Sequence, residues 1–146
     1  MNVNELRIGN LIRSNMINVF RVDQLYLTYH LDYVARMYLD NDISRYMELH
    51  VSMAEPIRLN DKILLMCGFK QATEYIFDHE SGVVFDAPND WIKSGKYPTE
   101  INCTMSVMGF NPEQIIIRTL TLHDLQNKFF AITGKELNVA NFLLSI

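Results

Sequence analysis

The segment Tyr26–Leu39 constrains the fold more than any other part of this chain. From Leu27 to Leu39 an apolar side chain stands at every second position, which is the period of a strand with one buried face. Several of the same side chains also share one stripe of a helix, so a helix stays open as an alternative. One straight strand of this length would span about 43 Å, which is long for a small domain. We therefore expect two strands, or one bent strand, over 26–39.

Other segments also have the composition and the alternation of strands. Strands are expected over Leu6–Arg13, Val19–Leu25, Tyr46–Val51, Ile101–Val107 and Gln114–Arg118, and a β-hairpin over Tyr75–Phe85. Gly9-Asn10 predicts a bulge or kink in the first of these strands. A loop is expected over Asp86–Pro98.

Two segments have the signals of helices. Over Leu59–Phe69, Asn60 is placed to cap the first turn, and Gly68 can adopt the left-handed conformation that ends a helix. The second helix follows Thr121 and ends at Gly134, with apolar side chains at helical spacing. The sequence thus predicts an α+β fold in which an antiparallel sheet packs with two α-helices, with a small barrel-like N-terminal half as one form of that sheet.

The size and composition are those of one folded domain. The chain has 146 residues, of which 49% are hydrophobic and 21% charged. A chain of this length can bury about two-thirds of its unfolded surface, so it needs no metal or disulfide to hold its core. We therefore expect a single α+β domain over 1–146.

The net charge of the chain and its N-terminal residues predict where the protein is located and which partners it binds. The net charge is −4, and no run of basic residues occurs. This disfavours nucleic acid as a partner, because such binding draws on Lys and Arg that neutralise phosphates. The first residues lack the basic and apolar regions of a signal peptide, and no apolar run approaches the roughly 20 residues of a membrane span. The sequence therefore predicts a cytoplasmic protein without a membrane partner.

The nucleophilic and phosphate-binding motifs of enzymes are not found in the sequence. Cys67 and Cys103 each stand alone, so we expect two reduced, buried thiols instead of a redox pair or a zinc site. There is no G-x-S-x-G, no G-x-x-x-x-G-K and no G-x-G-x-x-G. We assign no catalytic residue, no metal ligand and no cofactor.

Three polar clusters have the composition of functional sites, but we expect each of them to have a structural role. Asp78-His79-Glu80 has the composition of a metal or acid–base cluster, but it is typical of the polar tip of a hairpin. His123 is expected on the polar face of the last helix, beside Asn127. His30 and His50 could meet across strands, but two histidines fall short of the three or four ligands of a zinc site.

Tyrosine and methionine provide the functional signal that we retain. Both residue types are enriched at protein interfaces, where they bury area while adapting their shape. The candidate interface residues are Tyr26, Tyr29, Tyr33, Met37, Tyr38, Tyr46 and Met47. The ordinary alternative is that they form a core and its rim. A second candidate site is a pocket lined by Trp91, Tyr97 and Arg118.

Three stretches carry a family resemblance. They are Glu5–Asn10, Glu55–Asn60 and, as the most specific of them, Leu122–Leu137. In this order and spacing the chain resembles a family of small uncharacterised proteins from Bacteroides-type bacteria, their phages and mobile elements. Members usually carry an aromatic residue near the start of the first helix, where this chain has Lys62-Ile63-Leu64. The family has no assigned activity, so the resemblance implies a setting and no site residue.

These observations favour one function over two others. The first hypothesis is a non-enzymatic accessory protein of a phage or mobile element that binds a protein partner or forms a homo-oligomer. The second is a protein that binds a small molecule or nucleotide and acts against a host defence signal. The third is an enzyme of unknown type, for which the sequence offers no site.

Overall fold

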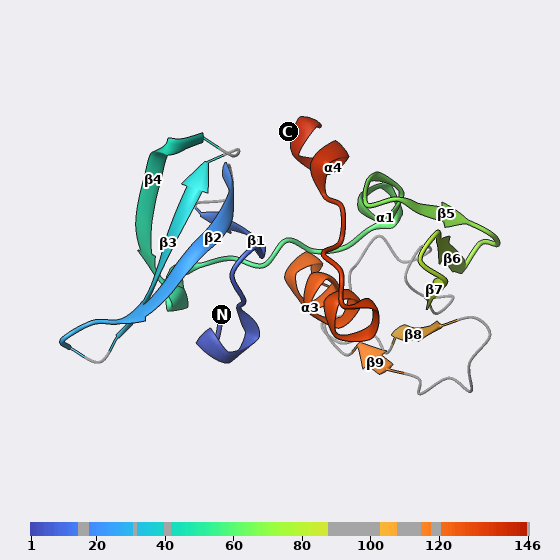
Figure 1. Ribbon diagram of the computed structural model, residues 1–146, viewed down its shortest axis with the longest axis horizontal. Helices are drawn as coiled ribbons and strands as arrows, with labels where there is room; N and C mark the ends of the chain where they lie inside the picture. Colours follow the sequence, from blue (N-terminus) through green and yellow to red (C-terminus); the bar gives the residue numbers. More distant parts are fainter. Residues whose placement is uncertain are drawn as a thin grey trace. The chain divides into compact units, whose positions relative to one another are not determined.

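The computed structural model describes residues 1–14, 18–30, 32–39, 42–87, 103–107, 115–117 and 121–145 (Figure 1). These residues fall into two compact units. The first comprises Met1–Arg58 and Thr121–His123, and the second comprises Leu59–Leu120 and Asp124–Ser145. Antiparallel sheets accompanied by helices confirm the predicted α+β class. That 1–146 is a single domain stays a prediction.

The first unit is built on a four-stranded antiparallel sheet. Its strands are β1 (Leu11–Ser14), β2 (Asn18–Leu27), β3 (Tyr33–Leu39) and β4 (Asp42–His50), in the order β1-β2-β3-β4. Each strand pairs with the next one along the chain. Among the described residues β1 and β4 do not pair with each other, so this sheet is open and the barrel-like form is not adopted.

The ambiguous segment 26–39 forms two strands joined by a turn, and the helical alternative was wrong. The backbone N–H of Thr28 donates to the carbonyl of Asp32 at 2.8 Å, and the N–H of Asp32 donates to the Thr28 hydroxyl at 3.3 Å. In β2 the pairing register shifts between Val22 and Gln24. This bulge explains the broken apolar pattern, because it lets both Val22 and Leu25 face the core.

The core of the first unit lies on one face of this sheet, which we call the inner face. Its buried side chains are Leu6, Ile12, Phe20, Val22, Ala35, Met37, Val51 and Ala54. Leu25, Met47 and Leu49 pack against them. Val51 belongs to the 3-10 helix η2 (Val51–Met53), which follows β4 directly.

The first strand is shorter than predicted. A 3-10 helix, η1 (Val3–Glu5), occupies the start of the chain, and strand pairing begins only at Leu11. Gly9 has a φ of +91°, which an L side chain rarely adopts, and the Asn10 side chain accepts a 2.7 Å hydrogen bond from the N–H of Arg7. The N–H of Gly9 donates to the Val22 carbonyl at 2.8 Å, and the N–H of Val22 donates to the Asn10 carbonyl at 2.9 Å. Gly9 and Asn10 thus stand together opposite Val22, and the predicted bulge before β1 is confirmed.

The second unit begins with the predicted first helix. Helix α1 (Asp61–Met66) is capped by the Asn60 side chain, which accepts a 2.9 Å hydrogen bond from the N–H of Ile63. Gly68, at a φ of +89°, ends the helix in the left-handed region, as expected. Cys67 is buried and free, which confirms the prediction for this thiol, and burial raises its pKa to about 12.

A five-stranded antiparallel sheet follows α1. Its strands are β5 (Phe69–Gln71), β6 (Ile76–His79), β7 (Val83–Asp86), β8 (Cys103–Val107) and β9 (Ile115–Ile117), in that order. The predicted hairpin is confirmed as the pair β6–β7, with Phe77 opposite Phe85. The predicted strands over 101–107 and 114–118 correspond to β8 and β9. The predicted loop over 86–98 lies almost wholly outside the described residues.

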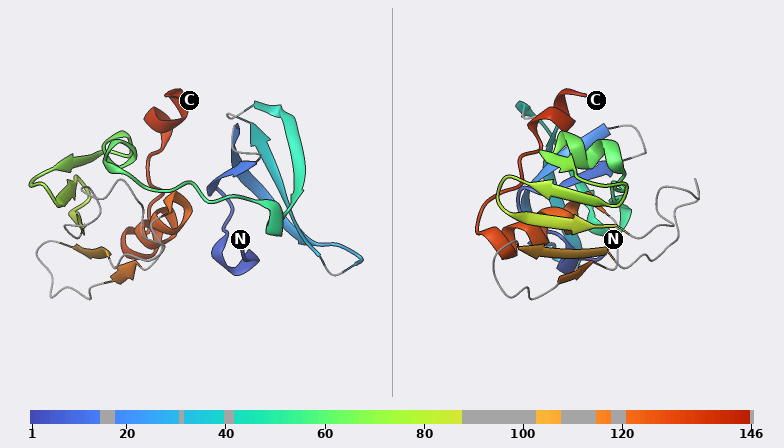
Figure 2. Two further views of the ribbon diagram at one scale, coloured as in Figure 1. Left: turned by 180° about the vertical axis from the view of Figure 1, so that it is seen from behind. Right: turned by 90° about the vertical axis from the view of Figure 1, so that its right-hand side faces the viewer.

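Two further helices complete the second unit, which includes the first of them from Asp124 onward. Helix α3 (Leu122–Thr133) ends at Gly134, which has a φ of +69° and donates its N–H to the carbonyl of Phe130. Helix α4 (Ala140–Leu144) was not predicted, and it lies beside α1. Within this unit the helices stand on one side of the strands (Figure 2).

Candidate functional site

Exposed apolar side chains concentrate at the end of the β2–β3 hairpin. We call this the hairpin end and define it by Tyr26, Leu27, Tyr29 and Tyr33, whose side chains are 37%, 49%, 97% and 47% exposed. Pairing of β3 with β4 starts at Val34, so the hairpin end projects past the last residues of β4 (Figure 1). Strand β4 therefore leaves these side chains uncovered.

A second exposed surface lies on the face of the first sheet opposite its core. We call it the outer face and define it by Tyr26, Arg36, Tyr38, Tyr46 and Glu48. The register places Tyr38 opposite Tyr46 and Arg36 opposite Glu48. Because directly opposed residues share a face, these four side chains form one patch.

The outer face is organised around Arg36. Its guanidinium carbon lies 4.2 Å from the centroid of the Tyr46 ring and 6.0 Å from that of Tyr38. The Tyr26 hydroxyl donates to the Glu48 carboxylate, and this bond is the main reason why the pKa of Tyr26 is raised. Arg21 of β2 stands opposite Tyr38 and so shares this face, and the patch combines tyrosine rings with the guanidiniums of Arg21 and Arg36 and the carboxylate of Glu48.

The seven candidate interface residues separate into three groups. Tyr26, Tyr29, Tyr33 and Tyr46 are exposed, whereas Tyr38 and Met47 are half-buried. Met37 is fully buried in the core, because its position in β3 alternates with Arg36 and Tyr38. The tyrosines therefore gather at the surface, and both methionines pack inward.

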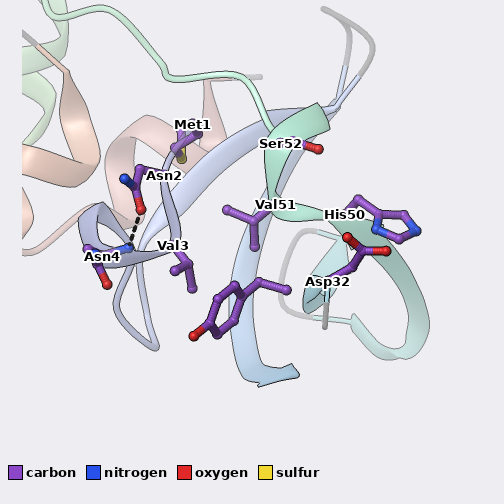
Figure 3. A pocket seen from close by; sticks show the side chains of 9 residues that line it. Met1, Asn2, Val3, Asn4, Asp32, His50, Val51 and Ser52 are labelled. Carbon is purple, nitrogen blue, oxygen red and sulfur yellow. Dashed lines mark hydrogen bonds between the residues drawn. The ribbon is translucent and has the colours of Figure 1, made fainter. Parts of the chain in front are cut away.

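The first unit contains a pocket of about 380 Å³ between η1, the start of β3 and the end of β4 (Figure 3). Its lining residues are Met1, Asn2, Val3, Asn4, Asp32, Tyr33, His50, Val51 and Ser52. The Asn2 side chain is already engaged, because it accepts a hydrogen bond from the N–H of Asn4 at 3.1 Å. The predicted pocket residues Trp91, Tyr97 and Arg118 all lie outside the described residues.

His79 was expected in the polar tip of a hairpin, but its ring packs among aromatic side chains. It closes strand β6, and its ring packs against Phe69 and Phe129, with centroids 5.0 Å and 4.9 Å away. The N–H of Ser81 donates to its Nδ1 at 3.1 Å, so the ring proton belongs on Nε2. Partial burial lowers the pKa of His79. Strand alternation was the missed signal, since His79 shares a face with Phe77.

His123 does not lie on a polar helix face, and that expectation was wrong. The side chain is 4% exposed, and burial lowers its pKa to about 4. Its Nε2 lies 3.5 Å from the Thr121 hydroxyl, and its Nδ1 has no hydrogen-bond partner among the described residues. The His123 carbonyl also accepts a hydrogen bond from the Asn10 side chain at 3.5 Å.

The histidines weighed as metal ligands do not form a cluster in the part of the chain that the structure describes. His30 lies in the exposed turn after β2, and His50 lies at the end of β4. Within the described ranges no three His, Cys, Asp or Glu residues come together in a way that could hold a metal ion.

The fold and its surfaces define a class: an α+β protein whose first sheet exposes a tyrosine-rich hairpin end and a tyrosine–arginine outer face. No family model, curated protein or solved structure matches this chain. Among its described helices, none has the length and apolar character needed to cross a membrane.

Proposed function

We propose that this chain is a non-enzymatic interaction protein that binds a protein partner through its hairpin end. The observation that carries this proposal is the exposure of four apolar or aromatic side chains within Tyr26–Tyr33, with Tyr29 almost fully solvated. Single exposed hydrophobic residues are ordinary on a protein surface, whereas a group of them marks an interaction site. The family resemblance adds the setting, an accessory role in a phage or mobile element.

The chemistry of these residues suits a protein partner. A tyrosine or leucine side chain moved from water into an interface contributes about 1.5–3 kcal/mol, so two or three of them are enough to drive binding. Tyrosine has two rotatable side-chain bonds, and ordering it therefore costs little entropy. Its hydroxyl keeps a polar contact while the ring is buried.

Site-specific photo-crosslinking tests the proposal. A benzoylphenylalanine residue replaces Tyr29 in one variant and Ile8 in a control, because Ile8 is 60% exposed in the same unit but lies outside the hairpin. In the native cells, position 29 should give one discrete cross-linked product that the added change Leu27→Ser weakens. Products that are equal at the two positions, or none at either, would refute the hairpin end as the contact surface.

The pocket favours a second candidate function, the binding of a small molecule. Its volume of about 380 Å³ lies at the lower end of the range for ligand sites. The nine lining residues include an aspartate and no lysine or arginine, which suits an uncharged polar ligand better than a nucleotide. A thermal-shift screen with sugars and nucleotides tests this, since a ligand at a hundred times its Kd adds about 2.7 kcal/mol of stability.

A further inference from the structure

On the outer face, the guanidinium of Arg36 forms no ion pair with a carboxylate among the described residues. Arg36 stacks on tyrosine rings, but no carboxylate pairs with it among the described residues, although Glu48 stands directly opposite in the register. Its Nε is buried without a hydrogen-bond acceptor in the same described set. The terminal nitrogens are then the donors that a second molecule can reach.

The outer face also holds an exposed carboxylate beside this cation. Glu48 is exposed, and it accepts a hydrogen bond from Tyr26. A carboxylate has about four acceptor positions, so one bond from a tyrosine leaves room for a guanidinium. The patch therefore presents the donor Arg36 and the acceptor Glu48 on neighbouring strands, with a second guanidinium, Arg21, on the far side of β3.

A surface with this arrangement is complementary to a copy of itself. A two-fold axis that runs along the strands, between β3 and β4, brings Arg36 of one copy over Glu48 of the other and forms the same pair twice. Such an isologous contact is the usual way in which soluble proteins dimerise. Two sheets packed face to face lie about 10 Å apart, a distance that tyrosine and arginine side chains can fill.

We infer that the outer face is a homodimer interface in which Arg36 pairs with Glu48 of a second copy. The patch spans three strands and is small, so the dimer is a weak one. Nucleic acid fits this face less well, because phosphate binding needs several cations and Glu48, which stands beside the guanidiniums of Arg21 and Arg36, would repel the phosphate backbone. The inference stays within the proposed class of interaction protein. It depends on Arg36 and Glu48, whereas the hairpin-end proposal depends on Leu27 and Tyr29; the two surfaces share Tyr26, and either proposal can fail alone.

Charge reversal with complementation tests the inference by analytical ultracentrifugation, over about 5 µM to about 1 mM protein. The wild-type chain should show a concentration-dependent dimer. Arg36→Glu and Glu48→Arg should each weaken self-association at least tenfold, because each places like charges across the interface. An equimolar mixture of the two variants should form a heterodimer, since both crossed pairs are then of opposite charge. The double variant R36E/E48R should dimerise with itself again.

Lys62→Glu serves as the matched control. It changes the net charge by the same amount as Arg36→Glu, at an exposed position in helix α1. This variant should dimerise as the wild type does, and far-ultraviolet circular dichroism checks that every variant is folded. A wild type that stays monomeric at about 1 mM, or a dimer unaffected by either reversal, would overturn the inference. The cross-linking result at position 29 would stand in both cases.

Discussion

The imidazole of His79 in β6 meets the ring of Phe129 in α3 edge-on, with the ring centroids 4.9 Å apart. Phe69 of β5 lies 5.0 Å from His79 and 6.5 Å from Phe129, so the three rings form one cluster. The cluster joins a helix to two strands of the second unit. Its contacts make Phe129 a central packing residue of that unit.

Phe129→Ala should therefore destabilise the protein by about 3–5 kcal/mol, because it leaves a cavity beside two rings. The neighbouring change Phe130→Ala is the control, since Phe130 is 40% exposed and Phe129 only 2%. We expect the control to cost about 1 kcal/mol or less. Urea unfolding followed by circular dichroism measures both, and equal losses would contradict the role given to Phe129.

His123 should make stability fall in mild acid. Its folded pKa is about 4, against an unfolded value near 6.5, so the neutral ring is favoured in the native state. The stabilisation that the neutral ring provides is complete above pH 6.5 and is lost as the pH falls from 6.5 towards 4. The loss amounts to about 2 kcal/mol at pH 5 relative to pH 8.

The variant His123→Gln isolates this contribution of His123 from that of other titrating groups. His79, whose pKa is also lowered, acts in the same direction and is present in both proteins. The free energy of unfolding, measured by urea at several pH values, should decline less steeply between pH 7 and 5 in the variant. Parallel curves for the two proteins would show that His123 is not the group responsible.

Substitutions at Met37 and Tyr29 should differ strongly in their effect on the free energy of unfolding, although both residues come from the tyrosine- and methionine-rich segment. Met37 is fully buried in the first unit, so Met37→Ala should cost about 2–5 kcal/mol. Tyr29 is 97% exposed, and Tyr29→Ser should change the unfolding free energy by about 0.5 kcal/mol or less. Thermal unfolding distinguishes the two, and a strongly destabilised Tyr29→Ser would mean that Tyr29 packs within the fold.

Asn60 should stabilise α1 through its cap. Asn60→Ala removes the acceptor for the N–H of Ile63 and should cost about 1 kcal/mol. Asn60→Asp keeps an acceptor at this place and should leave the stability nearly unchanged. Chemical unfolding of the three proteins tests this, and an alanine variant as stable as the wild type would rule out the cap as a stabilising contact.

The agreement between sequence and structure is closest where the signals are local. The Asn60 cap, the left-handed Gly68 and Gly134, and the β6–β7 hairpin all appear at the predicted positions. Of the candidate interface residues, Tyr26, Tyr29, Tyr33 and Tyr46 are exposed, Tyr38 is half-buried, and Met37 is buried by the alternation of β3. That these residues form an interface stays a prediction. The predicted pocket over Trp91, Tyr97 and Arg118 lies beyond the described residues and stays a prediction.

By itself, the sequence determined the kind and approximate place of most elements, because alternation, capping and turn residues act over only a few positions. The tertiary structure alone decided which side chains those elements bury. His79 meets Phe129 and Arg36 meets Tyr46 only after distant segments or neighbouring strands are brought together. Side-chain burial, and with it the pKa of His123 and the exposure of Tyr29, follows from packing across the whole unit, which no local pattern encodes.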